Sequence, residues 1–472
     1  MKVIKNYIYN VSYQILSIFI ALITTPYISR VLGATNIGIY SFSYSIAQYF
    51  ILFGSIGIAV FAQREIAYNQ DRVYDRSKKF WQLFLLRGIT VSISLIIYIF
   101  IIPKYSNYPM IASILSIEII STILDISWFF IGMEDFKRIT IRNLFVKLVG
   151  VICIFLFVKS KNDLPLYTII LSSSSLIGNL SLWISLPKFL VRIKIKDIKI
   201  FEFIKPAILL FIPQIANNVY YMLDKPMIGL LSNVTEVGYY EQATKISTLA
   251  LTIITAMGPV MLSRVAYTYA KKDDHLIITY LMNSIKFVFF LGVPLMLGLM
   301  AVAKGVVPWF MGAGFSKSTI LIVVLSPLII LIGLTNAIGS QYLLPLDKKK
   351  EYSVSVIVGI FINAGMNYFL ILKYNAFGAA LASVFSEIIV LIIQAYYVRN
   401  ELPIKTCFGQ SKNYFIAGII MYLFISILVD KILPIAIWSS CVEILVGIIV
   451  YMCVLVLLRD QLISKIFNMR KI

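Results

Sequence analysis

The chain has 472 residues, of which 60% are hydrophobic and 14% are charged, and its mean hydropathy is +0.89. Its apolar residues form blocks of about 20, the length that crosses roughly 30 Å of hydrocarbon, whereas soluble proteins carry about 25% charged residues. This composition excludes a soluble enzyme, a disordered chain and a secreted disulfide scaffold. The net charge is +20, but the basic residues lie in short loops between apolar blocks, which indicates membrane topology and no nucleic-acid partner.

In chain order, the apolar blocks predict an all-α polytopic membrane protein with about fourteen transmembrane helices. They run over residues 11–28, 39–61, 80–102, 110–131, 139–158, 166–186, 206–231, 238–262, 276–302, 318–344, 352–372, 377–398, 413–429 and 435–458.

The basic residues give these spans an orientation. With the N-terminus in the cytoplasm, 29 of the 42 Lys and Arg residues fall in cytoplasmic segments, 8 fall on the opposite side, and 5 lie inside spans. Cytoplasmic loops are enriched in Lys and Arg. The asymmetry therefore predicts that both termini are cytoplasmic.

Chemistry outside the membrane is not expected. The loops on the external side are short, and the only histidine, His275, falls on the cytoplasmic side. The four cysteines have no metal-binding or redox spacing, and no glycine-rich phosphate loop is present. We therefore expect no enzyme activity, no metal and no cofactor.

An internal repeat divides the chain. Pro26, Gly38 and Arg64 recur as Pro226, Gly238 and Arg264, each 200 residues further on. The offset contains six helices, so the two halves are parallel repeats, an arrangement in which transporters bind substrate between the halves. We expect a first six-helix lobe over residues 1–190, a basic linker over 191–205, a second lobe over 206–400, and two further helices with a cytoplasmic tail over 401–472.

Ionisable residues inside spans are costly and usually face a cavity or a partner. Apart from Arg142, which is counted with the cytoplasmic loop at the start of its span, eleven occur here: Arg87, Glu118, Asp125, Lys147, Asp224, Lys225, Glu241, Lys245, Lys286, Glu387 and Glu443. The seventh span has the most regular pattern, because its residues at i, i+4, i+7 and i+11 share one helical face; these are Gln214, Asn218, Tyr221 and Lys225. We predict that this face and Asp224, Lys245, Arg87 and Lys286 line a substrate cavity.

Other roles remain open for several of these residues. Glu241 and Lys245, four residues apart, could neutralise each other, and Arg87 and Lys286 could extend to an interface. Glu118 and Asp125 are seven residues apart and could be hydrogen-bonded acids inside the protein. Asp125, Glu118 and Asp224 are also the candidates for ion coupling.

One motif resembles a known family. Residues 125–137 read DISWFFIGMEDFK and are similar to the D-x-x-W-F-F-x-G-x-E-x-F-K stretch of the polysaccharide flippases known as Wzx. Residues 211–229 and 237–240 resemble the seventh-to-eighth helix segment of these proteins, and residues 26–33 resemble their first external turn.

The resemblance implies the multidrug/oligosaccharidyl-lipid/polysaccharide exporter superfamily, with two six-helix lobes around a central cavity and two additional helices. It implies a flippase of the bacterial cytoplasmic membrane that moves undecaprenyl-pyrophosphate-linked oligosaccharides from the inner to the outer leaflet for capsule, exopolysaccharide or O-antigen assembly. Its partners would be this lipid-linked substrate, membrane lipids, H⁺ or Na⁺, and a polymerase of the same pathway. The alternative is a cation-coupled multidrug exporter of the same fold.

Overall fold

The computed structural model describes residues 2–208, 219, 222–401, 409, 411–429 and 436–460, and the described part contains helices and no strand. Contacts between Cα atoms divide the chain into two compact units, Met1–Pro226 and Met227–Ile472. The predicted residues Gln214, Asn218 and Tyr221 lie outside the described residues.

The first unit contains α1 (Lys2–Ser55), α2 (Ile58–Tyr68), α3 (Val73–Tyr105), α4 (Pro109–Leu124), α5 (Ser127–Gly132), α6 (Phe136–Phe157), α7 (Leu164–Trp183) and the short 3₁₀ turns η1 (Lys161–Asp163), η2 (Leu186–Lys188), η3 (Ile195–Asp197) and η4 (Ile200–Phe203). The helix α9 (Asp224–Leu231) begins at the end of this unit and continues into the next.

The second unit contains α10 (Val234–Thr255), α11 (Gly258–Ala270), α12 (Asp274–Phe310), η5 (Ala313–Phe315), α13 (Ser316–Leu325), α14 (Leu328–Thr335), the π-helix η6 (Asn336–Leu343), α15 (Lys349–Tyr374), α16 (Ala376–Val398), α18 (Lys412–Phe424), the π-helix η7 (Ile425–Val429) and α20 (Ile437–Leu457).

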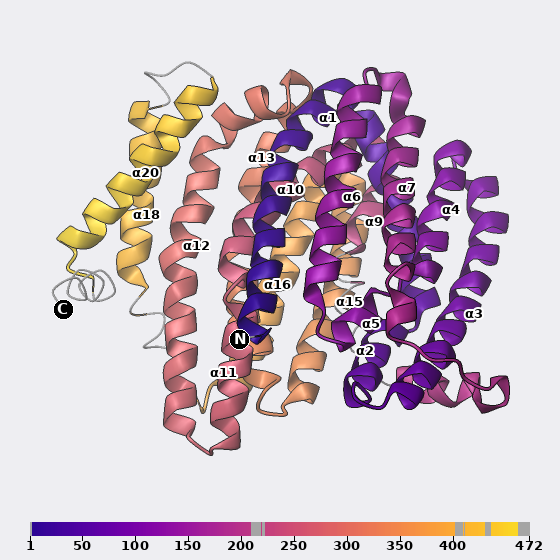
Figure 1. Ribbon diagram of the computed structural model, residues 1–472. Coiled ribbons are helices and arrows are strands. Elements are labelled where there is room, and N and C mark those ends of the chain that lie inside the picture. Colours follow the sequence, from indigo (N-terminus) through magenta and orange to yellow (C-terminus); the bar gives the residue numbers. More distant parts are fainter. Residues whose placement is uncertain are drawn as a thin grey trace. The chain divides into compact units, whose positions relative to one another are not determined.

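Ten helices of the described part are long and apolar enough to cross a membrane, or eleven if the bent pair α13 and α14–η6 is counted as one span. Leu16–Ser55 is counted once, although Gly33 has φ 75° and ψ 172°, which are not helical values. In Figure 1 the N-terminus and α2 lie in the lower half of the picture and the α1 label lies near the top, so the chain turns back within α1. Tyr27 and Asn36, on either side of Gly33, donate hydrogen bonds to the carbonyl oxygens of Val158 and Lys161.

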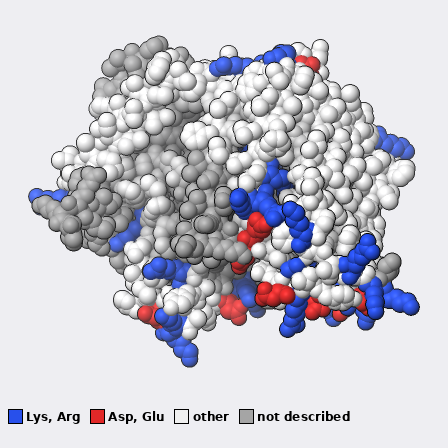
Figure 2. Space-filling model, viewed as in Figure 1, with Lys and Arg blue, Asp and Glu red and all other residues white. Residues whose placement is uncertain are grey.

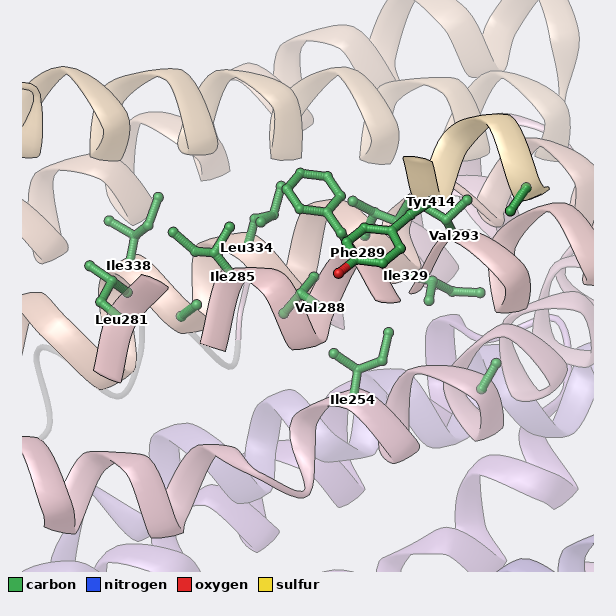
Figure 3. Close-up of a cluster of buried hydrophobic side chains, with 14 of the residues drawn as sticks. Ile254, Leu281, Ile285, Val288, Phe289, Val293, Ile329, Leu334, Ile338 and Tyr414 are labelled. Carbon is green, nitrogen blue, oxygen red and sulfur yellow. The ribbon is translucent and has the colours of Figure 1, made fainter. Parts of the chain in front are cut away.

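Each unit has its own apolar core. In the first unit, Phe80 is fully buried and contacts the rings of Trp128 and Phe129. In the second unit, one stripe of α12 that includes Leu281, Ile285 and Val288 packs against α14 and η6 (Figure 3). The spacing of this stripe, i, i+4 and i+7, places its members on one face of the helix.

Candidate functional site

The first polar cluster surrounds the break between α4 and α5. A helix leaves its last four carbonyl groups without partners in the helix, and α4 ends at Leu124 in the middle of a predicted apolar block. The Asp125 carbonyl oxygen accepts hydrogen bonds from Arg87 Nη1 at 2.8 Å and from Trp128 Nε1 at 3.0 Å. The Asp125 carboxylate in turn accepts the backbone N–H of Ser127 at 2.9 Å, at the start of α5.

Arg87 is the counter-ion of Asp125. Its guanidinium lies 3.4 Å from the Asp125 carboxylate, and the residue is 5% exposed. A buried charge needs such a partner, because desolvating a lone ion is costly. The structure therefore brings together two of the predicted residues and buries Arg87 inside the protein.

The helix α7 covers the same break from another side. Asn179 Nδ2 donates to the Ser121 carbonyl oxygen at 2.9 Å, and Trp183 Nε1 donates to that of Leu124 at 2.8 Å. The Arg142 Nη1 atom of α6 donates a hydrogen bond to Asn179 Oδ1 at 3.0 Å. Glu118, one of the coupling candidates, has a hydrogen bond with Ser175 of α7. The last turn of α4 is thus tied to α3, α5 and α7.

The motif around Trp128 also joins α5 to α2. Gln70 donates to the Gly132 carbonyl oxygen at 2.6 Å. A Cβ at Gly132 would lie 2.7 Å from the Gln63 carbonyl oxygen, so the two backbones approach more closely than any side chain allows. The described contacts of Asp125 and Trp128 stabilise the break between α4 and α5, and those of Gly132 bring α5 against α2.

Asp224 and Lys225 form the first turn of α9. Asp224 is 8% exposed and Lys225 is half-buried. Asp224 is close enough to Tyr49 of α1 for an electrostatic interaction. Tyr49 lines a cavity of about 540 Å³ between α1 and α3, together with Thr90 and Ser94. The structure therefore brings the Asp224 carboxylate near a cavity of the first unit.

Glu241 and Lys245 form an ion pair on α10. The Lys245 Nζ lies 3.4 Å from Glu241 Oε1, with 43% of the lysine side chain and 14% of the glutamate side chain exposed. Self-neutralisation, one of the two roles predicted for them, is therefore present in the structure.

Lys286 differs from the other predicted cations. It is half-buried on α12, twelve residues from the start of the helix, which corresponds to about 18 Å along its axis. It makes no hydrogen bond and no ion pair with any other residue that the structure describes. Ionisable groups inside spans usually face a cavity or a partner.

A second polar cluster, not predicted as a site, joins α15 and α16. Asn363 and Asn367 are almost fully buried, and Asn367 Nδ2 donates to Asn363 Oδ1 at 2.9 Å. Glu387 of α16 is 3% exposed, and its Oε1 accepts a hydrogen bond from Thr335 at 2.5 Å, where α14 becomes the π-helix η6. In the sequence, the sign of this cluster is a pair of asparagines four residues apart inside an apolar block. Their spacing alone does not distinguish a functional site from ordinary packing between helices.

No group of three or more His, Cys, Asp and Glu residues that could hold a metal ion occurs among the described residues. The polar clusters described above consist of ion pairs and hydrogen bonds.

The apolar helices, each longer than a bilayer core, and the charges buried within them define a multi-pass membrane protein. Residues 3–262, more than half of the chain, match the family described as "Polysaccharide biosynthesis protein", and the chain belongs to this family. The chain is 24% identical over 402 residues to the "Putative O-antigen transporter" of Escherichia coli (strain K12), an alignment that covers 84% of this chain and 97% of that one. It is 22% identical over 199 residues to the "Probable low-salt glycan biosynthesis flippase Agl15" of Haloferax volcanii, which covers 42% of each chain.

Solved structures share the fold. The lipid II flippase MurJ in an inward closed conformation has a TM-score of 0.80 at 18% identity, over 97% of this chain and all of that one. A multidrug resistance transporter of the MATE family in an inward-facing conformation has a TM-score of 0.61 at 12% identity, over 81% and 98% of the two chains. These relatives and neighbours are named transporters and flippases, and the chain is a transporter and not an enzyme.

Proposed function

We propose that the chain is a flippase that carries undecaprenyl-pyrophosphate-linked oligosaccharide units from the inner to the outer leaflet of the bacterial cytoplasmic membrane. The observation that carries this proposal is the match to an O-antigen transporter along 97% of that protein's length. The MurJ-like fold adds support. A headgroup with two phosphates and several sugars has a very large desolvation cost in hydrocarbon, and a polar route through the protein removes most of it.

The proposed topology has fourteen spans and cytoplasmic termini. Eleven spans follow from helix length and composition. Three more come from the turn at Gly33, from the short apolar helix Lys412–Ile427, and from the predicted span 206–231, which lies partly outside the described residues. The six-helix repeats then correspond to the two lobes proposed for alternating access.

Lys286 and Lys225 are the cations that we propose for the pyrophosphate. Lys286 is half-buried without a described partner, and Lys225 lies beside the buried Asp224. Arg87 and Lys245 already have carboxylate partners, so we assign them to structure first. Asp224, which is buried and lies near a cavity of the first unit, is the preferred candidate for H⁺ or Na⁺ coupling. A polymerase of the same pathway would consume the flipped product.

The test uses surface polysaccharide in cells that produce the chain. We expect Lys286→Gln to abolish surface polysaccharide and Lys286→Arg to retain part of it, because only the arginine keeps the charge. The matched control, Lys304→Gln, removes an exposed lysine from the same helix and should leave polysaccharide unchanged. Normal polysaccharide in a folded, inserted Lys286→Gln variant would assign Lys286 to another role.

A second variant pair addresses Lys225. Lys225→Gln should abolish polysaccharide, and Asp224→Asn combined with Lys225→Gln should not restore it, because the substrate's charge then stays unpaired at a cost of a few kcal/mol. Recovery in the double variant would make Lys225 the structural partner of Asp224.

The alternative is a cation-coupled multidrug exporter, supported by the shared fold with the MATE transporter. The two functions separate in one experiment. Cells with the chain should export undecaprenyl-linked glycan and show no change in ethidium accumulation. Ethidium export without an effect on glycan would favour the alternative.

A further inference from the structure

The segment that follows α7 is fastened to the first turn of α3. The Val191 backbone N–H donates to Ser77 Oγ at 2.9 Å, and Arg76 Nη2 donates to the Phe189 carbonyl oxygen at 2.5 Å. Tyr74 donates to Asp197 Oδ2, also at 2.5 Å. These three hydrogen bonds involve residues 74, 76 and 77 of α3. They hold the predicted linker 191–205 and the three residues before it against α3, although this segment contains only short 3₁₀ turns. Residues 188–205 together are called the basic linker from here on.

The basic linker exposes cations and apolar side chains together. Its six basic residues are all exposed; they are Lys188, Arg192, Lys194, Lys196, Lys199 and Lys205. The linker contains two acidic residues, Asp197 and Glu202. The Asp197 carboxylate accepts a hydrogen bond from Tyr74. Phe201 is 68% exposed and Val191 is 44% exposed. Figure 2 shows Lys and Arg side chains gathered at its lower right, over this segment and the nearby ends of α2 and α3.

The acids of α2 and α3 beside the linker are partly neutralised. Glu65 pairs with Lys79 at 3.2 Å, and the Lys79 ammonium lies 4.1 Å from the ring centre of Phe203. The buried side of the linker thus packs on α3 through Phe203, while its outer side keeps the excess positive charge.

The position of the linker along the chain places it at a membrane surface. It begins where the span Lys161–Lys188 ends, and its contacts are with the start of the span Val73–Tyr105. Segments that mix basic and large apolar side chains lie at the boundary between headgroups and acyl chains. Anionic lipids attract such basic segments. An exposed phenylalanine is unfavourable in water and favourable at that boundary.

We propose that the basic linker is a binding surface for the headgroups of anionic phospholipids, with Phe201 and Val191 inserted at the edge of the acyl chains. Binding would hold α3 and α7 at a fixed depth in the leaflet. This inference does not depend on what the protein transports.

The first experiment measures depth. Nitroxide labels are placed by Phe201→Cys or by Lys271→Cys, in the turn between α11 and α12, in full-length protein whose four native cysteines are replaced by serine. The protein is placed in nanodiscs of phosphatidylcholine with phosphatidylglycerol. We expect the label at position 201 to collide more with oxygen than with a water-soluble nickel chelate, and the label at 271 to show the reverse. Equal exposure of both labels to nickel would overturn the proposal.

The second experiment measures the lipid. The variant Lys194→Gln, Lys196→Gln, Lys199→Gln should retain about twofold less phosphatidylglycerol relative to phosphatidylcholine after purification, because each cation near the surface adds attraction. The matched control carries Lys104→Gln, Lys304→Gln and Lys373→Gln, three exposed lysines of other segments. It should retain the wild-type ratio. Equal losses in both variants, or no loss in either, would overturn a specific role for the linker.

Discussion

Arg87 and Asp125 meet at the end of α4, where one guanidinium group contacts both the backbone and the side chain of the same residue. Nη1 donates to the Asp125 carbonyl oxygen at 2.8 Å, and the carboxylate lies 3.4 Å from the guanidinium nitrogens. The pair therefore lies at the end of α4. The other carboxylate oxygen of Asp125 accepts the backbone N–H of Ser127, the first residue of α5.

This geometry predicts that Arg87 is required for stability. Arg87→Gln leaves the Asp125 charge unpaired and should lower the free energy of unfolding by about 3–5 kcal/mol. Arg87→Lys should lower it as well, because an ammonium group lacks the planar fork of the guanidinium. The measurement is thermal unfolding of purified protein in detergent. Lys286→Gln is the control, since it removes a cation that has no described partner; equal melting temperatures for Arg87→Gln and wild type would contradict the prediction.

Gly132 should not tolerate a methyl group. Gly132→Ala would place Cβ 2.7 Å from the Gln63 carbonyl oxygen and 2.9 Å from Ile66 Cβ. Such overpacking typically costs about 1–3 kcal/mol, so α5 should detach from α2 at lower temperature. At Gly88 of α3, a Cβ meets no atom within 4 Å, and Gly88→Ala should be neutral or slightly stabilising because alanine favours helices. Unfolding followed by tryptophan fluorescence compares the two, and equal effects would argue against the close α2–α5 contact.

The contacts of Glu401, in the loop after α16, predict that the stability of the folded protein depends on pH. Burial alone would raise the pKa of Glu401, but hydrogen bonds from Lys348 and Tyr342 and the charge of Lys348 together lower this pKa below its usual value. The ionised Glu401 carboxylate therefore stabilises the folded state fully above its unfolded-state pKa of about 4.3. This contribution to the free energy of unfolding is lost as the pH falls through the folded-state pKa.

Glu401→Gln should accordingly reduce stability at pH 7 by about 0.2–1 kcal/mol, the range for exposed pairs. The difference in the free energy of unfolding between this variant and wild type should shrink as the pH falls below about 4.3, the pKa of an unperturbed glutamate. Melting temperatures at several pH values provide the measurement. Glu202→Gln, an exposed carboxylate without a described ion pair, should show no such convergence, and a pH-independent deficit in Glu401→Gln would rule out the charge as its cause.

Topology is tested by thiol labelling. Asn162 and Arg72 are both exposed, in η1 and just before α3. The excess of Lys and Arg on one side predicts that Asn162 is external and Arg72 cytoplasmic. In intact cells that produce a variant without native cysteines, an impermeant reagent should label Asn162→Cys and miss Arg72→Cys. The opposite labelling pattern would invert the proposed orientation.

The sequence was sufficient for the positions of most helices, because burial in lipid requires long apolar runs. The block predicted at 377–398 corresponds to α16, Ala376–Val398, and the block at 139–158 to α6, Phe136–Phe157. The break at Asp125 could not be read from the same signal. Hydropathy averages over a window of residues, whereas the break depends on Arg87, Asn179 and Trp183, which are distant in sequence.

The same limit applies to the charged residues. Spacing alone allowed Glu241 and Lys245 to form a pair, since both lie on one helix four residues apart, and the structure contains this pair. The partner of Arg87 lies on another helix, and the hydrogen bond between Glu387 and Thr335 depends on how α14 packs against α16. Contacts between helices follow from packing, which a single sequence does not specify.

The backbone conformation of Gly33 affects which side of the membrane each later loop faces. Its backbone conformation, φ 75° and ψ 172°, is one that residues with side chains rarely adopt, and a Cβ there would meet no atom closer than the Lys161 side chain at 3.9 Å. The restriction at this position is thus torsional and not spatial. In the proposed topology, a residue that forced helical torsion angles at position 33 would join the two spans on either side of it into one continuous helix. The number of membrane crossings would then change from even to odd. Every later loop would then face the opposite compartment, with its lysines and arginines on the side that membrane insertion disfavours.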